Sequence, residues 1–546
     1  MMLRRDYRWS IIGGTAAFAA VFLFMALAVA ALLSFDAGAS TAGIMDAYTL
    51  RILRFTLYQA TLSTVLSVVL GLPVALALSR RQDFPGRIWI IRLMAVPMGL
   101  PVIVGAFGII AIWGRQGVLN TALVSAGADE PFNIYGLSGI LIAHVFFNLP
   151  LAVRLMLAGL ERIPGEYWRM AASLGMGPVS VFRFIEWPAV SRLVPGIAGL
   201  VFMLCATSFT LVLLLGGGPA ATTLEVAIYQ ALRFDFDPQR AIALSVLQIA
   251  LTAILLGLLA FLPSPEAEIA TLGRPLRRFD GKGVGARLWD GTAIVLAVLL
   301  IGLPLVAITV SGLSADLPRL LSAPIFLRAA ATSLAIAALS AILVVLTCMA
   351  IIAARQAVGS RRHAAQPLRF LSVTLGAGSS LVLLVPPVVL GSGWFLLLRP
   401  FGDVSFYAPV LVALINMLMA LPLAMRVLEP AFASHFLRTG RLSASLGLQG
   451  WTRLRFADLP VLRRPLLMAF SFAMALSLGD LGAVALFGSE SFVTLPWLVY
   501  SNMGSYRTND AAGYAFILGV VCLLLAAGGV SRQSQPAGAQ SARASI

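Results

Sequence analysis

The chain has 546 residues, of which 60% are hydrophobic and only 11% are charged. An ordinary soluble domain has about 25% charged residues, so this composition excludes a soluble globular protein. The formal net charge is +16. A basic balance of this kind fits nucleic-acid binding, anionic lipid or the orientation of membrane loops, and only the distribution of the charges decides between them.

Apolar runs make up most of the sequence. A helix needs about 20 apolar residues to cross the hydrocarbon core of a membrane, and about twelve runs reach that length. They cover residues 10–34, 51–79, 88–113, 136–160, 193–216, 241–263, 290–312, 325–354, 372–398, 405–428, 465–488 and 511–530. We therefore predict an all-α integral membrane protein with about 12 transmembrane helices. The first run is longer than the 7–15 apolar residues of a cleaved signal peptide, so we interpret it as a retained anchor helix.

Lysine and arginine are divided unevenly between alternate loops. If the N-terminus is cytoplasmic, about 30 of the 39 basic residues lie in cytoplasmic loops, as the positive-inside rule requires. This bias predicts a multi-pass membrane protein with both termini in the cytoplasm. The basic charge then reflects topology and contact with membrane lipid, so no nucleic-acid partner is expected.

One polar segment occurs twice. RMAASLGMGPVSVFRFIEWPAV at 169–190 recurs as RLSASLGLQGWTRLRFADLPVL at 441–462. At the same offset Pro150 matches Pro422, Gly175 matches Gly447, Pro188 matches Pro460, Gly216 matches Gly488 and Thr222 matches Thr494. Six spans in each half give both halves the same topology, which is a parallel repeat. We predict a first half at 1–270, a cytoplasmic linker at 271–289 and a second half at 290–546, with the repeated loops at about 161–192 and 429–464.

A two-half membrane protein with a path between its halves is typical of a transporter. Ionisable residues are almost absent from the span centres, which argues against an ion-coupled carrier. The candidates for the path are Ser208, Gly216, Gly217, Asp480 and Gly488. The only lysine, Lys282, precedes Gly283, whereas a phosphate-binding P-loop needs Ser or Thr there. ATP hydrolysis on this chain is not expected, and its scattered Cys and His residues predict no metal site.

The repeated segments are candidates for a docking surface. In each, we expect a short helix that ends at Gly175 or Gly447 and a second helix that follows across the membrane face. Small side chains at Ala171, Ala172, Ser443 and Ala444 would let another protein approach the backbone closely. A basic helix lying in the membrane interface is the alternative.

The spacing within these segments resembles the EAA coupling loop of binding-protein-dependent ABC transporter permeases. Gly175 and Gly447 match the conserved Gly of that pattern, and Pro188 and Pro460 match its closing Pro. Arg169 and Arg441 stand where the pattern has Glu, and Ala171 and Ser443 stand at its second Ala, ahead of Ala172 and Ala444. The resemblance implies a type I importer permease that docks two cytoplasmic ATPase subunits and an external substrate-binding protein. ATP and Mg²⁺ would be held by the ATPase subunits, and no cofactor by this chain.

Two long stretches, at 208–238 and 477–513, resemble thiamine transporter permeases. The resemblance implies import of thiamine and of its phosphates. A ferric-iron permease of the same fused architecture is the main alternative, followed by a secondary carrier with 12 spans and a duplicated structural protein. We place Glu225 in an acidic outer loop, where Tyr229, Phe234, Tyr500 and Tyr506 either offer aromatic faces to a cation or anchor the membrane interface.

Overall fold

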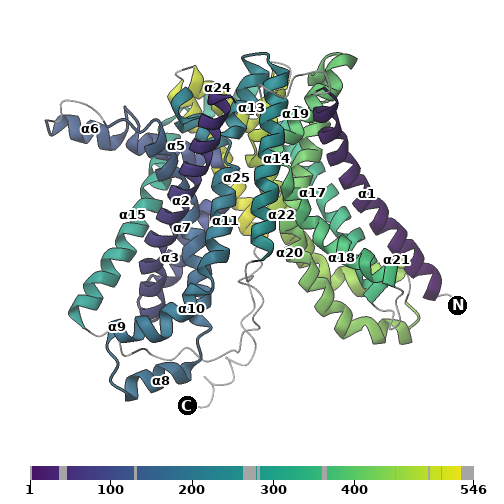
Figure 1. The fold of residues 1–546 in the computed structure, drawn as a ribbon, viewed down its shortest axis with the longest axis horizontal. Helices are drawn as coiled ribbons and strands as arrows, with labels where there is room; N and C mark the ends of the chain where they lie inside the picture. Colours follow the sequence, from purple (N-terminus) through teal and green to yellow (C-terminus); the bar gives the residue numbers. More distant parts are fainter. Residues whose placement is uncertain are drawn as a thin grey trace.

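The computed structural model describes residues 3–35, 46–127, 132–261, 278, 283–359, 366–448, 450–489, 492–505 and 507–529. Every regular element within these ranges is a helix (Figure 1). The predicted all-α fold is therefore confirmed.

The helices of the first half are α1 (Leu3–Phe35), α2 (Ala47–Arg80), α3 (Arg87–Leu93), α4 (Val96–Gly99), α5 (Val102–Trp113), α6 (Val118–Ser125), α7 (Leu137–Glu161), α8 (Gly165–Ser173), α9 (Pro178–Val181), the π-helix η2 (Phe182–Glu186), α10 (Trp187–Ser191), α11 (Val194–Ala206), α12 (Thr210–Leu215), η3 (Pro219–Ala221), α13 (Leu224–Arg233) and α14 (Pro238–Ala260).

The helices of the second half are α15 (Val284–Ser314), α16 (Leu317–Ser322), α17 (Pro324–Gly359), α18 (Gln366–Leu381), η4 (Val382–Leu384), α19 (Pro387–Leu398), η5 (Arg399–Phe401), η6 (Val404–Phe406), α20 (Ala408–Ser445), α21 (Gly450–Arg453), the π-helix η7 (Leu454–Asp458), α22 (Leu459–Gly479), α23 (Gly482–Phe487), α24 (Leu495–Gly504) and α25 (Thr508–Gly529).

The described residues contain 10 helices that are long and apolar enough to cross a membrane. An eleventh span is present if the pair Pro178–Ser191 and Val194–Ala206, which is bent by 52°, counts as one. The sequence predicts about twelve, and the difference lies partly in the run 372–398, whose second part is the shorter apolar helix Pro387–Phe401. Proline lacks the N–H that continues a helix, and Pro386 and Pro387 fall where this run divides. Most of the predicted linker lies outside the described residues, and α15 begins at Val284.

The internal repeat extends to individual helices. α12 begins at Thr210 and α23 at Gly482, an offset of 272 residues. α13 begins at Leu224 and α24 at Leu495, an offset of 271. The repeat has therefore lost one residue between these helices, and Thr494 is equivalent to Thr223 rather than to Thr222. Both threonines occupy the N-cap position of their helix.

Each half places its first helix against the other half. α1 packs along α17 and α19, whereas α15 packs along α2 and α5 (Figure 1). Glycines make the equivalent contacts possible, because small residues let helices approach closely in a membrane. A Cβ atom added to Gly108 in α5 would lie 2.6 Å from the carbonyl oxygen of Pro304, and one added to Gly393 in α19 would lie 2.3 Å from that of Ala28. The two halves are thus joined by the packing of each first helix against the other half.

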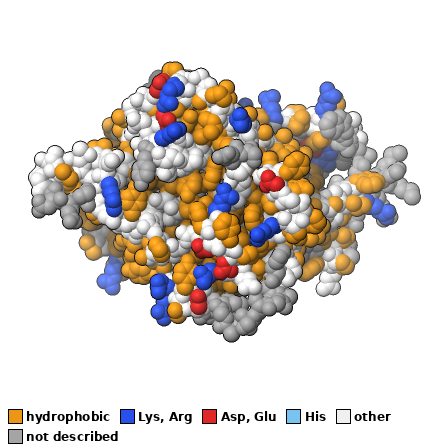
Figure 2. Space-filling view, turned by 90° about the horizontal axis from the view of Figure 1, so that it is seen from above, with side chains coloured by type: hydrophobic (Ala, Val, Ile, Leu, Met, Phe, Trp, Pro, Cys, Tyr) orange, Lys and Arg blue, Asp and Glu red, His pale blue; other side chains and the backbone are white. Residues whose placement is uncertain are grey.

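The two ends of the molecule differ. The repeated segments lie at one end, with α8 and α9 on one side and α21 on the other (Figure 1). The short helices α13 and α24 lie toward the opposite end (Figure 1). Figure 2 views the molecule from above in that orientation, and charged side chains are few and scattered among hydrophobic and uncharged ones.

Candidate functional site

The first repeated segment has a sharp backbone turn at Gly175. The N–H of Met176 donates to the carbonyl of Ala171 over 3.0 Å, and the N–H of Gly175 donates to that of Ala172 over 3.2 Å. These two bonds form a Schellman motif at the end of α8. Gly175 has φ +64°, a left-handed conformation that only glycine adopts without cost. The predicted end of the helix at Gly175 is confirmed.

The second segment repeats this turn. The N–H of Leu448 donates to the carbonyl of Ser443 over 3.0 Å, and Gly447 has φ +65°. The helix before the turn differs between the halves. α20 runs unbroken to Ser445, whereas Pro164 separates α8 from α7. Phe436 occupies the position equivalent to Pro164, so nothing interrupts the helix there.

A five-residue π-helix follows in both segments. The N–H of Trp187 donates to the carbonyl of Phe182, and the N–H of Leu459 donates to that of Leu454, in each case five residues back. The predicted Pro188 and Pro460 come directly after these wide turns, in the first turn of α10 and α22. Proline is tolerated in the first turn of an α-helix, where the N–H group that it lacks is not needed. The repeat therefore preserves backbone geometry as well as sequence.

Equivalent apolar side chains of the two segments are exposed. Leu174 and Leu446 are 69% and 64% exposed, and Phe184 and Phe456 are 65% and 68% exposed. The pairs Met170 with Leu442 and Trp187 with Leu459 are exposed as well. We call these eight side chains the apolar docking set. The two repeated segments therefore expose apolar side chains at equivalent positions.

The predicted small residues divide into two kinds. Ala171 and Ser443 are buried within this chain, so they are not available to a partner. Ala172 is exposed, and the side chains of Ala444 and Arg441 lie outside the described residues. Arg169 pairs with Glu166 at 3.0 Å, with both side chains largely exposed.

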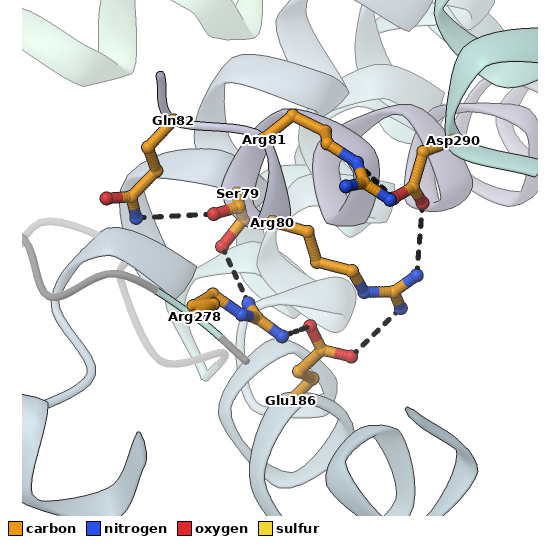
Figure 3. Close-up of polar contacts among 7 residues, drawn as sticks. All are labelled: Ser79, Arg80, Arg81, Gln82, Glu186, Arg278 and Asp290. Carbon is orange, nitrogen blue, oxygen red and sulfur yellow. Dashed lines mark hydrogen bonds and ion pairs between the residues drawn. The ribbon is translucent and has the colours of Figure 1, made fainter. Parts of the chain in front are cut away.

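A buried ion cluster fixes the first segment. Glu186, at the end of η2, is fully buried and accepts hydrogen bonds from Arg278 at 2.6 Å and from Arg80 at 3.2 Å (Figure 3). The guanidinium of Arg278 also lies 3.9 Å from the ring centroid of Trp168 in α8. Arg278, which lies between the two halves in the sequence, therefore contacts both parts of the segment.

The same cluster reaches the second half. Arg80 donates to Asp290 in α15 at 3.1 Å, and Arg81 donates to the other oxygen of that carboxylate at 3.0 Å (Figure 3). Buried charges persist only when they are paired. The first segment, α2 and α15 are therefore joined by alternating charges.

The second segment also contains a buried acid, which pairs with residues of its own half. Asp458 is equivalent to Glu186 and pairs with His435 at 2.8 Å and with Arg453 at 3.5 Å. Val181, the equivalent of Arg453, is buried in a small apolar cluster with Ala171 and Ile185. Arg453, the extra basic residue of the second segment, thus pairs with Asp458 as Arg80 and Arg278 pair with Glu186 in the first segment. The sequence carried a signal for these acids, because Glu186 and Asp458 share the 272 offset in otherwise basic segments.

The predicted path residues lie at equivalent helix breaks. Ser208 separates α11 from α12, and Asp480 separates α22 from α23. Asp480 accepts bonds from the N–H groups of Gly482 and Ala483, both at 3.2 Å, and so caps α23. A cavity of about 10 Å³ lies beside it.

Glycines end the next short helix in each half. The N–H of Gly216 donates to the carbonyl of Val212 at 2.8 Å, and that of Gly488 donates to Val484 at 2.7 Å. Gly217 has φ +68°, and a Cβ atom there would lie 2.8 Å from Tyr135. The structure therefore brings the two sets of predicted path residues into matching positions.

The outer-loop assignment of Glu225 is wrong. Glu225 and Tyr229 are both buried in α13, where they are 1% exposed. Phe234 is exposed at the end of that helix, and its ring meets Tyr229 edge to face. Sequence reasoning missed α13 as an internal helix because its ten residues are too few to cross a membrane. Tyr506 lies outside the described residues.

The structure is that of a multi-pass membrane protein with two repeated halves, each of which carries one of the repeated segments at the same end of the molecule. Residues 67–262 match the family model of the inner membrane component of binding-protein-dependent transport systems. The chain is 49% identical to the thiamine transport system permease protein ThiP of Brucella abortus (strain 2308), with 94% of each chain covered. It is 44% identical to ThiP of Escherichia coli (strain K12), with 88% of each covered.

A third relative corresponds to part of the chain. The molybdenum transport system permease protein ModB of Mycobacterium bovis is 31% identical over 37% of this chain and 75% of its own length.

The chain therefore belongs to the binding-protein-dependent transport permeases, in the family of the thiamine transport system permease proteins. It is a multi-pass inner-membrane protein and a transport subunit rather than an enzyme. The ferric-iron and secondary-carrier alternatives are not favoured.

Proposed function

We propose that this chain carries thiamine, and its phosphates, across the inner membrane as the permease of an ATP-driven importer. The observation that carries the proposal is the identity of 49% and 44% to two thiamine transport permeases over nearly the whole chain. The match is not confined to one half, since 94% of both chains is covered in the first comparison. A path formed between both halves would therefore be shared with these relatives.

Two ATPase subunits would drive the movement. Each would dock on one repeated segment through the apolar docking set, and ATP and Mg²⁺ would be bound by those subunits. The equal exposure of Leu174 and Leu446 supports two docking sites of one kind. Nucleotide that favours the closed ATPase pair shifts the permease only through differential affinity for its two states. The ion cluster around Glu186 would transmit that shift from the first segment to α2 and α15.

The docking end would face the cytoplasm, with both termini on that side. The start of α1 lies at the same end of the molecule as α8 and α21 (Figure 1), which supports this orientation together with the basic bias of these loops. A substrate-binding protein would deliver thiamine to the opposite end.

Uptake of labelled thiamine tests the proposal. Cells that lack this protein should take up little thiamine, and restoring the gene should restore uptake in the presence of a ferric-iron competitor. Unchanged thiamine uptake in the deletion strain, or restored transport of iron alone, would overturn the substrate assignment.

A further inference from the structure

The helices α13 and α24 cross the boundary between the halves. α13 belongs to the first half but packs against α19 and α23 of the second, and α24 of the second half packs against α5 of the first. Their N-terminal turns are held alike. Thr56 accepts the N–H of Leu224 at 3.1 Å, and Ser333 accepts that of Leu495 at 2.8 Å. Side chains on these helices therefore lie where a path between the halves must pass.

Glu225 is a buried acid that makes no ion pair with any residue the structure describes. Its side chain is 1% exposed, and its Oε1 has no hydrogen-bond partner in the described part of the chain. An unpaired buried carboxylate is costly, and the nearby helix N-terminus offsets only part of that cost. The equivalent position in α24 is Pro496, so the repeat does not need an acid there to fold.

Asp480 is a second acid without an acidic counterpart. The equivalent residue in the first half is Ser208. A Cβ atom added to Gly482 would lie 3.5 Å from Oδ1 of Asp480 and 3.7 Å from the ring of Phe209, and the same ring meets Tyr229 of α13, so Asp480 lies beside the helix that carries Glu225. The symmetry of the repeat is thus broken by one acid from each half at the same place.

Aromatic rings complete the surroundings. Tyr229 follows Glu225 by one turn, and its repeat equivalent is Tyr500. Phe209 meets Tyr229 edge to face, with 5.4 Å between ring centroids. Arg233 is the cation of α13, and its guanidinium donates to the carbonyl of Gly488 at 2.7 Å.

We propose that Glu225, Asp480 and the Tyr229–Tyr500 pair form a recognition site for an organic cation in the translocation path, with the thiazolium ring as its ligand. The choice of ligand rests on the proposed transport of thiamine. Buried carboxylates attract a cation strongly, and aromatic faces bind it further. The cavity of about 10 Å³ beside Asp480 is lined by residues of the second half alone and is too small for such a ring, so the surrounding helices would have to move apart before the ring enters.

The test compares a cation with its neutral isostere. The complete transporter, with its ATPase subunits and binding protein, is reconstituted in liposomes and offered labelled thiamine or the analogue in which carbon replaces the thiazolium nitrogen. E225Q should lower thiamine uptake at least tenfold relative to wild type and change uptake of the neutral analogue less than twofold. Stimulated ATP hydrolysis should persist, and E225D should recover much of the thiamine uptake. D235N, which changes an exposed carboxylate just beyond α13, is the matched control.

Each outcome bears on the site. Equal loss of both compounds in E225Q would show that Glu225 is structural, and unchanged uptake of both would also overturn the site. D480N provides the same comparison if E225Q fails to assemble. A wild-type transporter that moves neither compound contradicts the proposed function itself, and with it a thiazolium site.

Discussion

Glu186 and Arg278 form an ion pair of 2.6 Å in which both side chains are buried. The acid lies in the first repeated segment, and the base lies between the two halves. The pair makes the first segment depend on a residue outside its own half. Among the described residues, the acid of the second segment pairs within its own half, since Asp458 contacts His435 and Arg453.

The substitution E186Q should destabilise the protein more than R278M. The amide would remove the carboxylate that both Arg80 and Arg278 contact, so that Asp290 alone would offset the charges of Arg80 and Arg81, and breaking a buried pair costs about 3–5 kcal/mol. In R278M, Glu186 keeps Arg80. Thermal unfolding of the purified protein in detergent measures both. E166Q, which affects an exposed pair, should cost about 0–1 kcal/mol, and an E186Q protein as stable as E166Q would contradict the importance of the cluster.

The substitutions G175A and G447A should uncouple ATP hydrolysis from transport while leaving membrane insertion intact. No atom lies within 4 Å of an added Cβ at either position, so the effect is one of backbone strain alone, about 1–2 kcal/mol for a left-handed alanine. G177A is the control, because Gly177 has φ −74° and an equally open surrounding. Reconstituted uptake and ATP hydrolysis are measured together. Equal uptake in G447A and G177A would exclude a role for the turn.

The substitutions L174D and L446D should weaken ATPase binding without unfolding the permease. Both leucines are exposed, so a carboxylate costs little in the free protein, but it would have to be buried on docking. Each single change should weaken binding of the ATPase subunits at least tenfold, and the double change should abolish copurification. L174M and L446M retain the apolar surface and should bind normally. Full copurification of the double aspartate variant would exclude this surface as the docking site.

Two separately expressed pieces, 1–270 and 271–546, should assemble in the membrane. α1 packs on α17 and α19, while α15 packs on α2 and α5. Each piece therefore contains a helix that packs against the other piece. Affinity purification of one piece should recover the other. A matched pair cut at 1–150 and 151–546, which divides α7, should assemble less well. Pieces 1–270 and 271–546 that never copurify would contradict the exchange of first helices.

Much of this architecture follows from local sequence rules. Apolar length predicts the spans, and the repeated Gly175 and Gly447 predict the helix ends because a left-handed turn requires glycine. The prediction fails where burial decides. Glu225 has an acidic side chain and lies in a helix too short to span a membrane, so sequence rules place it in an outer loop. The packing of α13 across the halves buries it instead.

Sequence rules also do not predict which residues form the ion cluster. Arg278 pairs with a residue 92 positions away, and no periodicity indicates which of many arginines meets Glu186. The repeat register shows a smaller limit of the same kind. A deletion of one residue moved the true partner of Thr494 from Thr222 to Thr223, and only the helix starts reveal it.

The central claim is that this chain moves thiamine at the expense of ATP hydrolysed by separate subunits. The most direct measurement is accumulation of labelled thiamine in liposomes that contain the complete transporter, with wild-type ATPase or with an ATPase whose P-loop lysine is replaced. We expect accumulation only with wild-type ATPase and ATP. Equal accumulation with the inactive ATPase would contradict the claim and identify a carrier that needs no nucleotide.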